Sequence, residues 1–579
     1  MKRIFSILGL SVLAVLLMGQ VVYEGKFTIK IDQWHGLNSD ELYSRDLSYA
    51  KDMLNLDVGV EGANTYLQQR EGYRRVFLKL PVSSGLISIG LFQPSADSER
   101  IVAGVLNGDY YTTTGLSDTW RALTGRGVGG VAVYNNFTQF KDTLIVRGGG
   151  IAGTTTYLMA KASGLFKIVA SLGGNWNFGR MLLHQDRIYG YGLSAGYGSS
   201  QLAWMPEFSL QFDRWQNLVD SNLNAGFFYV NLNDGDFITN IIPMDNHLIV
   251  YKSRSIYRVL ISPETNAPAE VIKIADRIGA FGYNAATEYN GVQYFIAQDG
   301  VYSLDGVHVT KLSTPINNVF SDSLAVTSGS NGIFKIAFLK NRLYCLIPIQ
   351  TGNNHSRWYI YDLETKTWVK YILNRNPTSS EESIVPLVRY DFNSSSTSYI
   401  LNGVGFYIDG FRISRLIFGY DSTNVGLLNI FPGGTWADAD QDSNGLLDSI
   451  SWFYQTGISP LGEMWKRKQF ERVLTYAWID NLAGGSTGES TRRRQGFNID
   501  WYSDRNQATL WTTRDSIVSN IYVGGGVYST DGEFLRNYRI NPIVSGSLLG
   551  YKISGTGGGV KINAMEIIGS EKGMADDTE

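Results

Sequence analysis

The chain has 579 residues, more than one ordinary domain needs, although a β-propeller can reach several hundred residues as a single unit. Its 44% hydrophobic residues allow a sizeable core, and 64 glycines with 13% aromatic residues favour many short strands joined by tight turns. The formal net charge of -3 argues against a dedicated nucleic-acid-binding protein, which is usually strongly basic. That balance still allows a wall past which nucleic acid slides.

The N-terminus is apolar. Lys2 and Arg3 precede an uncharged run over residues 4–23. A basic start followed by an apolar stretch is typical of a secretory signal, and about 20 apolar residues also suffice for a membrane anchor. The alternative is that residues 1–23 are an apolar segment buried in an assembly. The sequence leaves both interpretations open.

Residues 24–84 form the next region. Residues 26–32 are predicted to be a short strand, and the polar stretch after it is compatible with one helix at 44–54. We expect residues 24–84 to be a strand and helix region that docks on the following domain.

Residues 85–428 show a repeat of roughly 40 to 50 residues, the spacing of propeller blades. Each repeat contains an apolar strand, a turn rich in Asn, Asp or Gly, and a second apolar strand, which together predict a hairpin. The clearest strand pairs are 101–106 with 110–113, 134–140 with 143–147, 180–184 with 187–191, 241–244 with 247–251, 286–289 with 292–296, and 335–339 with 342–347. Second hairpins at 298–306 and 358–371 complete four-stranded units, and the last unit is expected near 383–420. The predicted fold class is all-β, a divergent six- or seven-bladed β-propeller followed by a C-terminal β-sandwich.

An acidic joint is expected at residues 429–452. Its side-chain oxygens recur at alternate positions before a glycine, as in the first half of a calcium loop. The candidate ligands are Asp438, Asp440, Asp442, Asn444 and Asp448. Ser451 occupies the position where such a loop has its bidentate glutamate. The segment is therefore either a structural Ca²⁺ site or a solvated acidic turn.

Residues 453–569 are predicted to be the β-sandwich, and residues 570–579 a disordered tail. Its expected strands are 450–454, 469–479, 496–502, 538–544 and 560–568. Two basic clusters, at 466–468 and 492–494, fit either solvated loops or contacts with a polyanion or an acidic neighbouring subunit.

Nucleophilic catalysis finds no support in the sequence, and a propeller hydrolase or lyase, which would work through carboxylates gathered at the channel mouth, is the least favoured alternative. The five histidines are scattered, and no nucleophile elbow, zinc-binding helix or phosphate-binding loop occurs in a convincing context. Cys345, the only cysteine, lies inside the apolar run 343–349 and is expected to be a buried small hydrophobic residue. The chain is therefore predicted not to be an enzyme, with no catalytic or cofactor-binding residues.

Short motifs along the chain resemble the nozzle or tail tubular proteins of short-tailed bacteriophages. The first set is Gly-Leu-Asn at 36–38, then Asn55, then Gln-Arg-Glu-Gly-Tyr at 69–73. The second is Asp-Arg-Ile-Gly at 276–279, the stretch 290–306, and Leu-Ser-Thr-Pro-Ile at 312–316. The third comprises 454–459, 466–473, 551–556 and 562–567. Their order and spacing, rather than any single motif, carry the resemblance.

The resemblance implies a non-enzymatic virion protein of the phage tail. Such a protein would assemble as a homo-oligomeric ring, commonly hexameric, near the tail adaptor or portal-proximal proteins and the tail fibres. It would line the channel for genome ejection, with DNA as a transient occupant and no small-molecule substrate. The alternative is a secreted or surface-anchored, calcium-stabilised β-propeller that binds glycans or proteins, for which residues 4–23 would be the signal or membrane contact.

Overall fold

The computed structural model divides the chain into two compact units, which we call the propeller unit (Glu71–Asp448) and the sandwich unit (Met1–Arg70 with Ser449–Glu579). The structure describes residues 25–574 except 40–45, 76–85, 93–99, 106–109, 114–119, 123–136, 142, 149–155, 162–165, 170–179, 192–199, 205–225, 233, 262–267, 283–284, 324–333, 340, 351–354, 372–388, 392–397, 401–404, 409–413, 421–425, 431–436, 439–447, 460–465, 481–495, 504–512, 519–532, 541–543, 547 and 557–558. No helix in that described part is long and apolar enough to span a membrane. The apolar N-terminal segment and residues 575–579 lie outside it. The disordered tail predicted at 570–579 is wrong over residues 570–574, which continue strand β44 (Val560–Met574) and pair with neighbouring strands.

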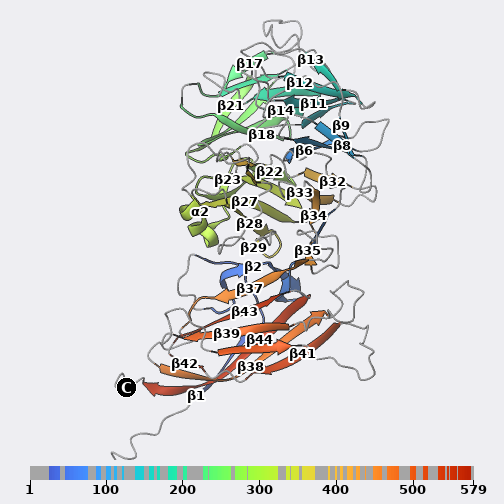
Figure 1. The fold of residues 1–579 in the computed structure, drawn as a ribbon. Helices are drawn as coiled ribbons and strands as arrows, with labels where there is room; N and C mark the ends of the chain where they lie inside the picture. Colours follow the sequence, from blue (N-terminus) through green and yellow to red (C-terminus); the bar gives the residue numbers. More distant parts are fainter. Residues whose placement is uncertain are drawn as a thin grey trace, which may run out of the picture. The chain divides into compact units, whose positions relative to one another are not determined.

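The propeller unit contains seven four-stranded antiparallel sheets among its described residues, which are the blades of a β-propeller (Figure 1). The first three blades are β6–β9 (Leu86–Phe92, Arg100–Val105, Tyr110–Thr113, Arg121–Ala122), β10–β13 (Phe137–Phe140, Thr143–Gly148, Thr156–Lys161, Phe166–Val169) and β14–β17 (Arg180–His184, Arg187–Tyr191, Gln201–Trp204, Gly226–Tyr229). The next three are β18–β21 (Ile238–Met244, His247–Lys252, Ser255–Ile261, Pro268–Asp276), β22–β25 (Ala286–Tyr289, Val292–Ala297, Gly300–Leu304, Val309–Lys311) and β26–β29 (Lys335–Leu339, Arg342–Gln350, His355–Asp362, Thr367–Tyr371). The predicted all-β class and propeller are confirmed.

The seventh blade combines both ends of the propeller unit. Its strands are β32 (Gly405–Ile408), β33 (Ser414–Tyr420), β34 (Gly426–Ile430) and β5 (Tyr73–Arg75), in that order. The expected last unit at 383–420 is therefore wrong in extent, because β30 (Arg389–Asp391) and β31 (Ser398–Ile400) form a separate hairpin. The outermost strand comes instead from upstream of the expected propeller boundary at residue 85.

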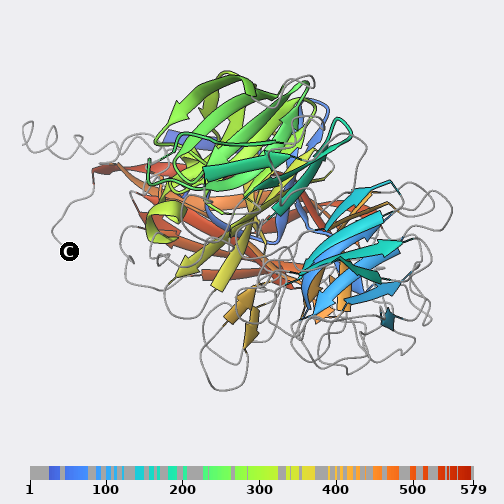
Figure 2. The same ribbon diagram turned by 90° about the horizontal axis from the view of Figure 1, so that it is seen from above.

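The blades form a ring. The first strands of successive blades contact one another in the pairs β6–β10, β10–β14, β18–β22 and β22–β26, and β32 of the last blade contacts β6 of the first. Figure 2 shows the blue to cyan blades apart from the group of green blades. A closed ring of sheets leaves only short, protected edges, which explains why a strand from the opposite end of the unit completes the last blade.

The predicted hairpins are confirmed in register. β14 pairs with β15 through His184 and Arg187, and β22 pairs with β23 through Tyr289 and Val292. Both residues of each intervening turn have positive φ: 48° and 55° at Gln185 and Asp186, and 50° and 76° at Asn290 and Gly291. A two-residue turn with this backbone matches the twist of the strands it joins, and Asn, Asp and Gly adopt it at low cost.

The sandwich unit consists of two antiparallel sheets built from both ends of the chain, drawn in blue and in orange to red in Figure 1. One sheet has the order β3-β4-β44-β38-β41, with β1 beside β44 and β42 beside β38; its strands are Leu56–Glu61, Asn64–Gln69, Val560–Met574, Lys466–Asp480, Glu533–Ile540, Gly25–Ile31 and Val544–Gly546. The other has the order β2-β37-β43-β39-β40, with strands Ala50–Leu54, Ser451–Thr456, Leu549–Thr556, Gly496–Ser503 and Thr513–Val518. The predicted sandwich is confirmed, and the propeller unit is inserted within it.

The region expected at residues 24–84 differs from this arrangement. Residues up to Arg70 group with the C-terminal strands and contribute four strands to the sandwich. The helix proposed at 44–54 is wrong, because Ala50–Leu54 is strand β2 paired with β37. The helices of the described residues are the 3-10 turn η4 (Thr314–Ile316) and α2 (Asn317–Ser323).

Aromatic side chains bind the N-terminal segment into the sandwich core. The fully buried Trp34 packs edge-on against Tyr454, with ring centroids 5.3 Å apart, and its indole N–H donates to the carbonyl of Asn563. The hydroxyl of Tyr551 donates to the carbonyl of Leu47 at 2.8 Å. These two hydrogen bonds join residues 529 and 504 positions apart in sequence, so both chain ends stabilise one core.

Candidate functional site

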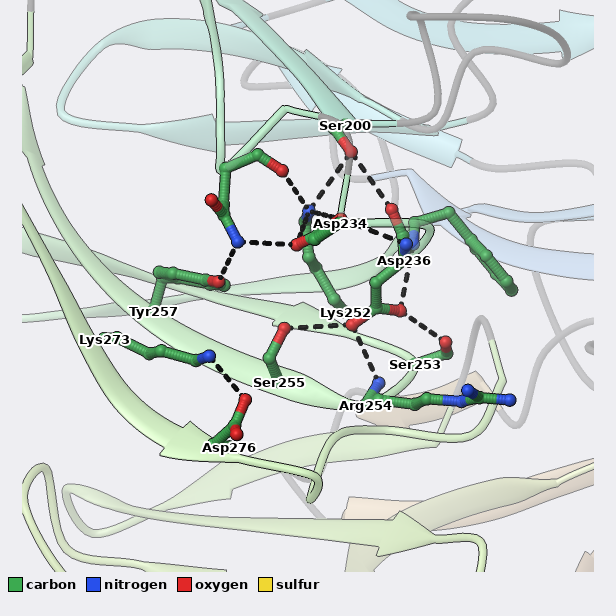
Figure 3. Close-up of polar contacts among 12 residues, drawn as sticks. Ser200, Asp234, Asp236, Lys252, Ser253, Arg254, Ser255, Tyr257, Lys273 and Asp276 are labelled. Carbon is green, nitrogen blue, oxygen red and sulfur yellow. Dashed lines mark hydrogen bonds and ion pairs between the residues drawn. The ribbon is translucent and has the colours of Figure 1, made fainter.

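A buried polar cluster lies between blades 3 and 4, and Figure 3 shows its side chains. Lys252, at the end of β19, is 0% exposed. Its ammonium group donates to both carboxylate oxygens of Asp234, at 2.8 and 2.7 Å, and to the hydroxyl of Ser200 and the carbonyl of Asn231 at 3.1 Å. A buried lysine is stable only with such partners, because the burial of an unpaired charge costs several kcal/mol.

Asp236 holds the turn that follows Lys252. One carboxylate oxygen accepts from the hydroxyl of Ser253, and the other from the backbone N–H of Arg254 and the hydroxyl of Ser255, at 3.0 and 2.9 Å. Asp236 belongs to the segment between β17 and β18, whereas the turn joins β19 to β20. The carboxylate therefore fixes the connection between two blades to the tip of the second blade (Figure 3).

The next connection along the chain packs against the same turn. A Cβ atom on Gly279 would lie 2.1 Å from the carbonyl oxygen of Lys252 and 2.7 Å from the N–H of Arg254, so only glycine fits without a backbone shift. Thr239 and Asn240 of β18 donate to the carbonyls of Ala280 and Gly282. The Asp-Arg-Ile-Gly motif thus ends on a residue that the packing of blade 4 requires.

The cluster is built for position rather than for reaction. The ammonium of Lys252 has no exposed surface, and the hydroxyls of Ser200, Ser253 and Ser255 donate to protein oxygens. A nucleophile or general base must be accessible to substrate. These groups are instead buried or hydrogen-bonded to other protein atoms. Beside the cluster, an exposed ion pair with Asp276 raises the pKa of Lys273 and lowers that of Asp276 (Figure 3).

The predicted metal ligands lie mostly outside the described residues. Asp440, Asp442 and Asn444 fall within the gap at 439–447. Asp438 and Asp448 are described as backbone, on the short paired strands β35 (Ala437–Asp438) and β36 (Asp448–Ser449) that bracket the gap. Among the residues whose positions are described, no group of three or more His, Cys, Asp or Glu could hold a metal ion.

Cys345 is buried as predicted. It is 0% exposed on β27, and burial raises the pKa of its thiol well above the ordinary value. Because the thiolate is the reactive form, this cysteine is inert. Burial also lowers the pKa of His35 and of His184, and neither lies in the cluster around Lys252.

The first basic cluster is not a solvated loop. Lys466, Arg467 and Lys468 begin the long strand β38 and pair with β44, and Lys468 is only 1% exposed. Arg492, Arg493 and Arg494 lie outside the described residues.

Sequence reasoning missed Asp234, Asp236 and Lys252. Lys252 ends the apolar strand His247–Lys252, where a charged residue normally indicates that the chain has reached solvent. The available sequence signals were two aspartates, Asp234 and Asp236, just before blade 4, and the Lys-Ser-Arg-Ser stretch at 252–255 within that blade.

Comparison with protein-family models finds no match for this chain. A search of curated proteins also finds none. Solved structures that resemble it include the WD40 domain of Neurospora crassa Pan2 (10% identity, TM-score 0.36, 63% of this chain and 97% of that chain), BamB from Moraxella catarrhalis (10%, 0.33, 72% and 99%) and a streptogramin B lyase (11%, 0.37, 62% and 98%). At these identities the likeness concerns propeller architecture alone.

Proposed function

We propose that the chain is a structural virion protein, a subunit of the tail nozzle or tube of a short-tailed bacteriophage. It assembles as a homo-oligomeric ring, and the ring forms part of the channel for genome ejection. The observation that carries this proposal is where the motifs that resemble that family lie in the fold. Described residues of these motifs pack in the core or form hydrogen bonds that hold strands and blades together.

The first motif set supports the proposal in the sandwich. Gly36 accepts from the N–H of Ala50, Asn38 donates its N–H to the carbonyl of Ala50, and Leu37 between them is buried. The segment 36–38 thereby covers the free edge of β2 at its first residue, Ala50. A covered edge prevents pairing with unwanted strands, which a subunit that must assemble in one defined way requires.

The second motif set supports the proposal in the propeller. Gly279 allows blade 4 to pack closely, and the hydroxyl of Ser313 accepts from the N–H of Val301. The indole N–H of Trp368 donates to the carbonyl of Leu312, which links blade 6 to the end of blade 5. Motif residues that have packing and hydrogen-bonding roles in this chain favour a scaffold, and we propose a non-enzymatic role on this basis.

We further propose that residues 438–448 hold a structural Ca²⁺ ion. The paired strands β35 and β36 close the base of the segment, which would bring its oxygen ligands together. At a calcium concentration about 100-fold above its dissociation constant, the ion would stabilise the folded chain by about 2.7 kcal/mol. Thermal unfolding of the full chain in calcium and in chelator tests this. A melting temperature that is the same in both contradicts the site, and magnesium serves as the control ion.

Imaging of the full chain tests the virion role. We expect negative-stain micrographs and native mass spectra of the purified protein to show closed rings of several copies. Antibodies against the chain should label the tail end of particles from its source. A protein that stays monomeric, is absent from particles, and binds glycans in a calcium-dependent way would support the secreted propeller instead.

A further inference from the structure

We propose that Asn55, Arg70 and Ser451 form a latch that holds the propeller ring closed. The chain leaves the sandwich unit at Arg70 and returns to it at Ser449. Asn55 connects the outgoing segment to the returning strand, and the outgoing segment leads directly into the strand that closes blade 7. This inference does not depend on the proposed virion role.

The latch is a hydrogen-bond network that is buried at Asn55 and Arg70 and partly buried at the Ser451 carbonyl. The side chain of Arg70 is 0% exposed, and its Nε donates to Oδ1 of Asn55 at 3.0 Å. The backbone N–H of Arg70 donates to the carbonyl of Asn55, also at 3.0 Å. The Nδ2 of Asn55 donates to the carbonyl of Ser451 at 2.8 Å. One asparagine therefore ties together two segments that 378 residues of propeller separate.

Asparagine suits this position for two reasons. Its φ of 54° lies in the left-handed region, which asparagine adopts more readily than most residues, at the corner between β2 and β3. Its amide is both an acceptor for Arg70 and a donor to Ser451. Aspartate would keep the acceptor and lose the donor, and glycine would keep the backbone conformation and lose both.

The closing strand needs such an anchor. β5 comprises only Tyr73–Arg75 and pairs with three residues of β34, Leu428–Ile430. A strand this short is below the usual length of about five residues and forms few ladder bonds. Only Glu71 and Gly72 separate it from Arg70, so fixing Arg70 lowers the conformational entropy that β5 loses when it docks.

The latch makes the closure of the propeller depend on the sandwich. When the network at Asn55 opens, the end of β4 loses its anchor, and among the described elements β5 is then held by its three-residue ladder with β34 and by contacts with β35. Blade 7 then opens locally, while the other blades, whose strands all come from consecutive segments, keep their pairing. The seventh blade is thus the one blade whose stability is set outside the propeller unit.

Hydrogen exchange of the full chain, read by mass spectrometry, tests the latch. In Asn55→Gly we expect the protection of amides in β34 and β5 to fall about tenfold, the change expected for the loss of about 1.4 kcal/mol of buried hydrogen bonding. Blade 5 is the internal reference and should be unchanged. Asn55→Asp, which keeps the bond to Arg70, should produce a smaller fall and serves as the milder variant.

Tyr454→Phe is the matched control. It removes a buried hydrogen bond from the same unit, between the Tyr454 hydroxyl and the carbonyl of Ser48, without touching the latch. We expect it to leave exchange in blade 7 unchanged. Equal exchange of blade 7 in wild type and Asn55→Gly, or an equal rise in Tyr454→Phe and Asn55→Gly, overturns the proposal.

Discussion

The propeller and the sandwich differ in how far apart in sequence their paired strands lie. In blades 1 to 6 each strand pairs with its neighbour in sequence, across turns as short as two residues. The sandwich also has local pairs, β3 with β4 and β39 with β40, but it adds pairs between the chain ends: β2 pairs with β37 and β1 with β44, so these partners lie about 400 to 540 residues apart. Local pairing costs little loop-closure entropy, whereas the sandwich depends on the propeller's folded ends being brought together.

The two regions also place their polar ties differently. The propeller joins adjacent blades through charged groups, with Lys252 and Asp236 as centres, each acting within about 50 residues. The sandwich joins distant segments through tyrosine and asparagine bonds to backbone carbonyls. Damage to a propeller tie should therefore stay local, and damage to a sandwich tie should reach both chain ends.

The largest expected effect is at Lys252. Lys252→Met leaves the Asp234 carboxylate, 19% exposed, without its cation, and should destabilise the propeller unit by about 3 kcal/mol. Urea unfolding with hydrogen exchange of each unit measures this. Lys252→Met combined with Asp234→Asn should recover part of the loss, because the unpaired charge is removed. Loss of protection in the sandwich equal to that in blade 4 would contradict local damage.

Gly279→Ala should have the next largest effect. The new methyl group would meet backbone atoms of Lys252, Arg254 and Ser255, which cannot move without disturbing the turn between β19 and β20. Overpacking of this kind costs about 1–3 kcal/mol. Gly291→Asn is the control, since that turn residue has positive φ and open space around it. Equal melting temperatures for Gly279→Ala and wild type would contradict the packing argument.

Paired tyrosine variants compare the two regions directly. Tyr551→Phe leaves the buried carbonyl of Leu47 unpaired, and Tyr251→Phe removes the 2.6 Å bond from Tyr251 to Gln293 between blades 4 and 5. Each should cost about 1 kcal/mol. Exchange should rise in both N- and C-terminal peptides for Tyr551→Phe, but only in two blades for Tyr251→Phe. The same pattern of exchange in both variants would contradict the claim that lost bonds act locally in the propeller and over both chain ends in the sandwich.

The sequence predicts the locally paired parts of the fold better than the parts that pair over long sequence distances. The turns at Gln185–Asp186 and Asn290–Gly291 could be predicted because local residues set their backbone. Strand β2 could not, since its sequence Ala-Lys-Asp-Met-Leu is equally compatible with a helix and it becomes a strand by pairing with residues 453–456. β5 was missed for the same reason, as three residues carry no pattern that reveals a partner near residue 430.

The candidate site was harder to predict than the fold. Gly279 was recognised within a motif, but its reason, the approach of the Lys252 carbonyl, exists only in the folded chain. The burial of Lys252 likewise depends on Asp234, from the connection that precedes its blade. Residues 439–447, where the sequence makes its sharpest metal prediction, lie outside the described structure.

Acidification should produce the smallest loss of stability. Each unit contains a histidine whose pKa is lowered by burial: His35 in the sandwich and His184 in the propeller. Burial lowers the pKa of His35, stacked on Tyr49 with Asp46 nearby, and of His184, whose Nε2 is buried without a partner among the described residues. Below the ordinary pKa of 6.5 the unfolded chain binds more protons than the folded one. Stability is therefore complete above that value and declines as pH falls toward the lowered pKa of each histidine.

Variants separate the two contributions. His35→Phe should reduce the acid-induced loss of protection in the sandwich only, and His184→Phe in the third blade only, measured by hydrogen exchange corrected for intrinsic rates at about pH 7.5 and about pH 5.5. A wild-type protein that is equally stable at both values would contradict the pKa directions. If His184→Phe instead reduced the acid-induced loss of protection in the sandwich, a residue of one blade would affect the stability of a core built from both ends of the chain. That result would contradict the local stabilisation of the propeller that its strand pairing indicates.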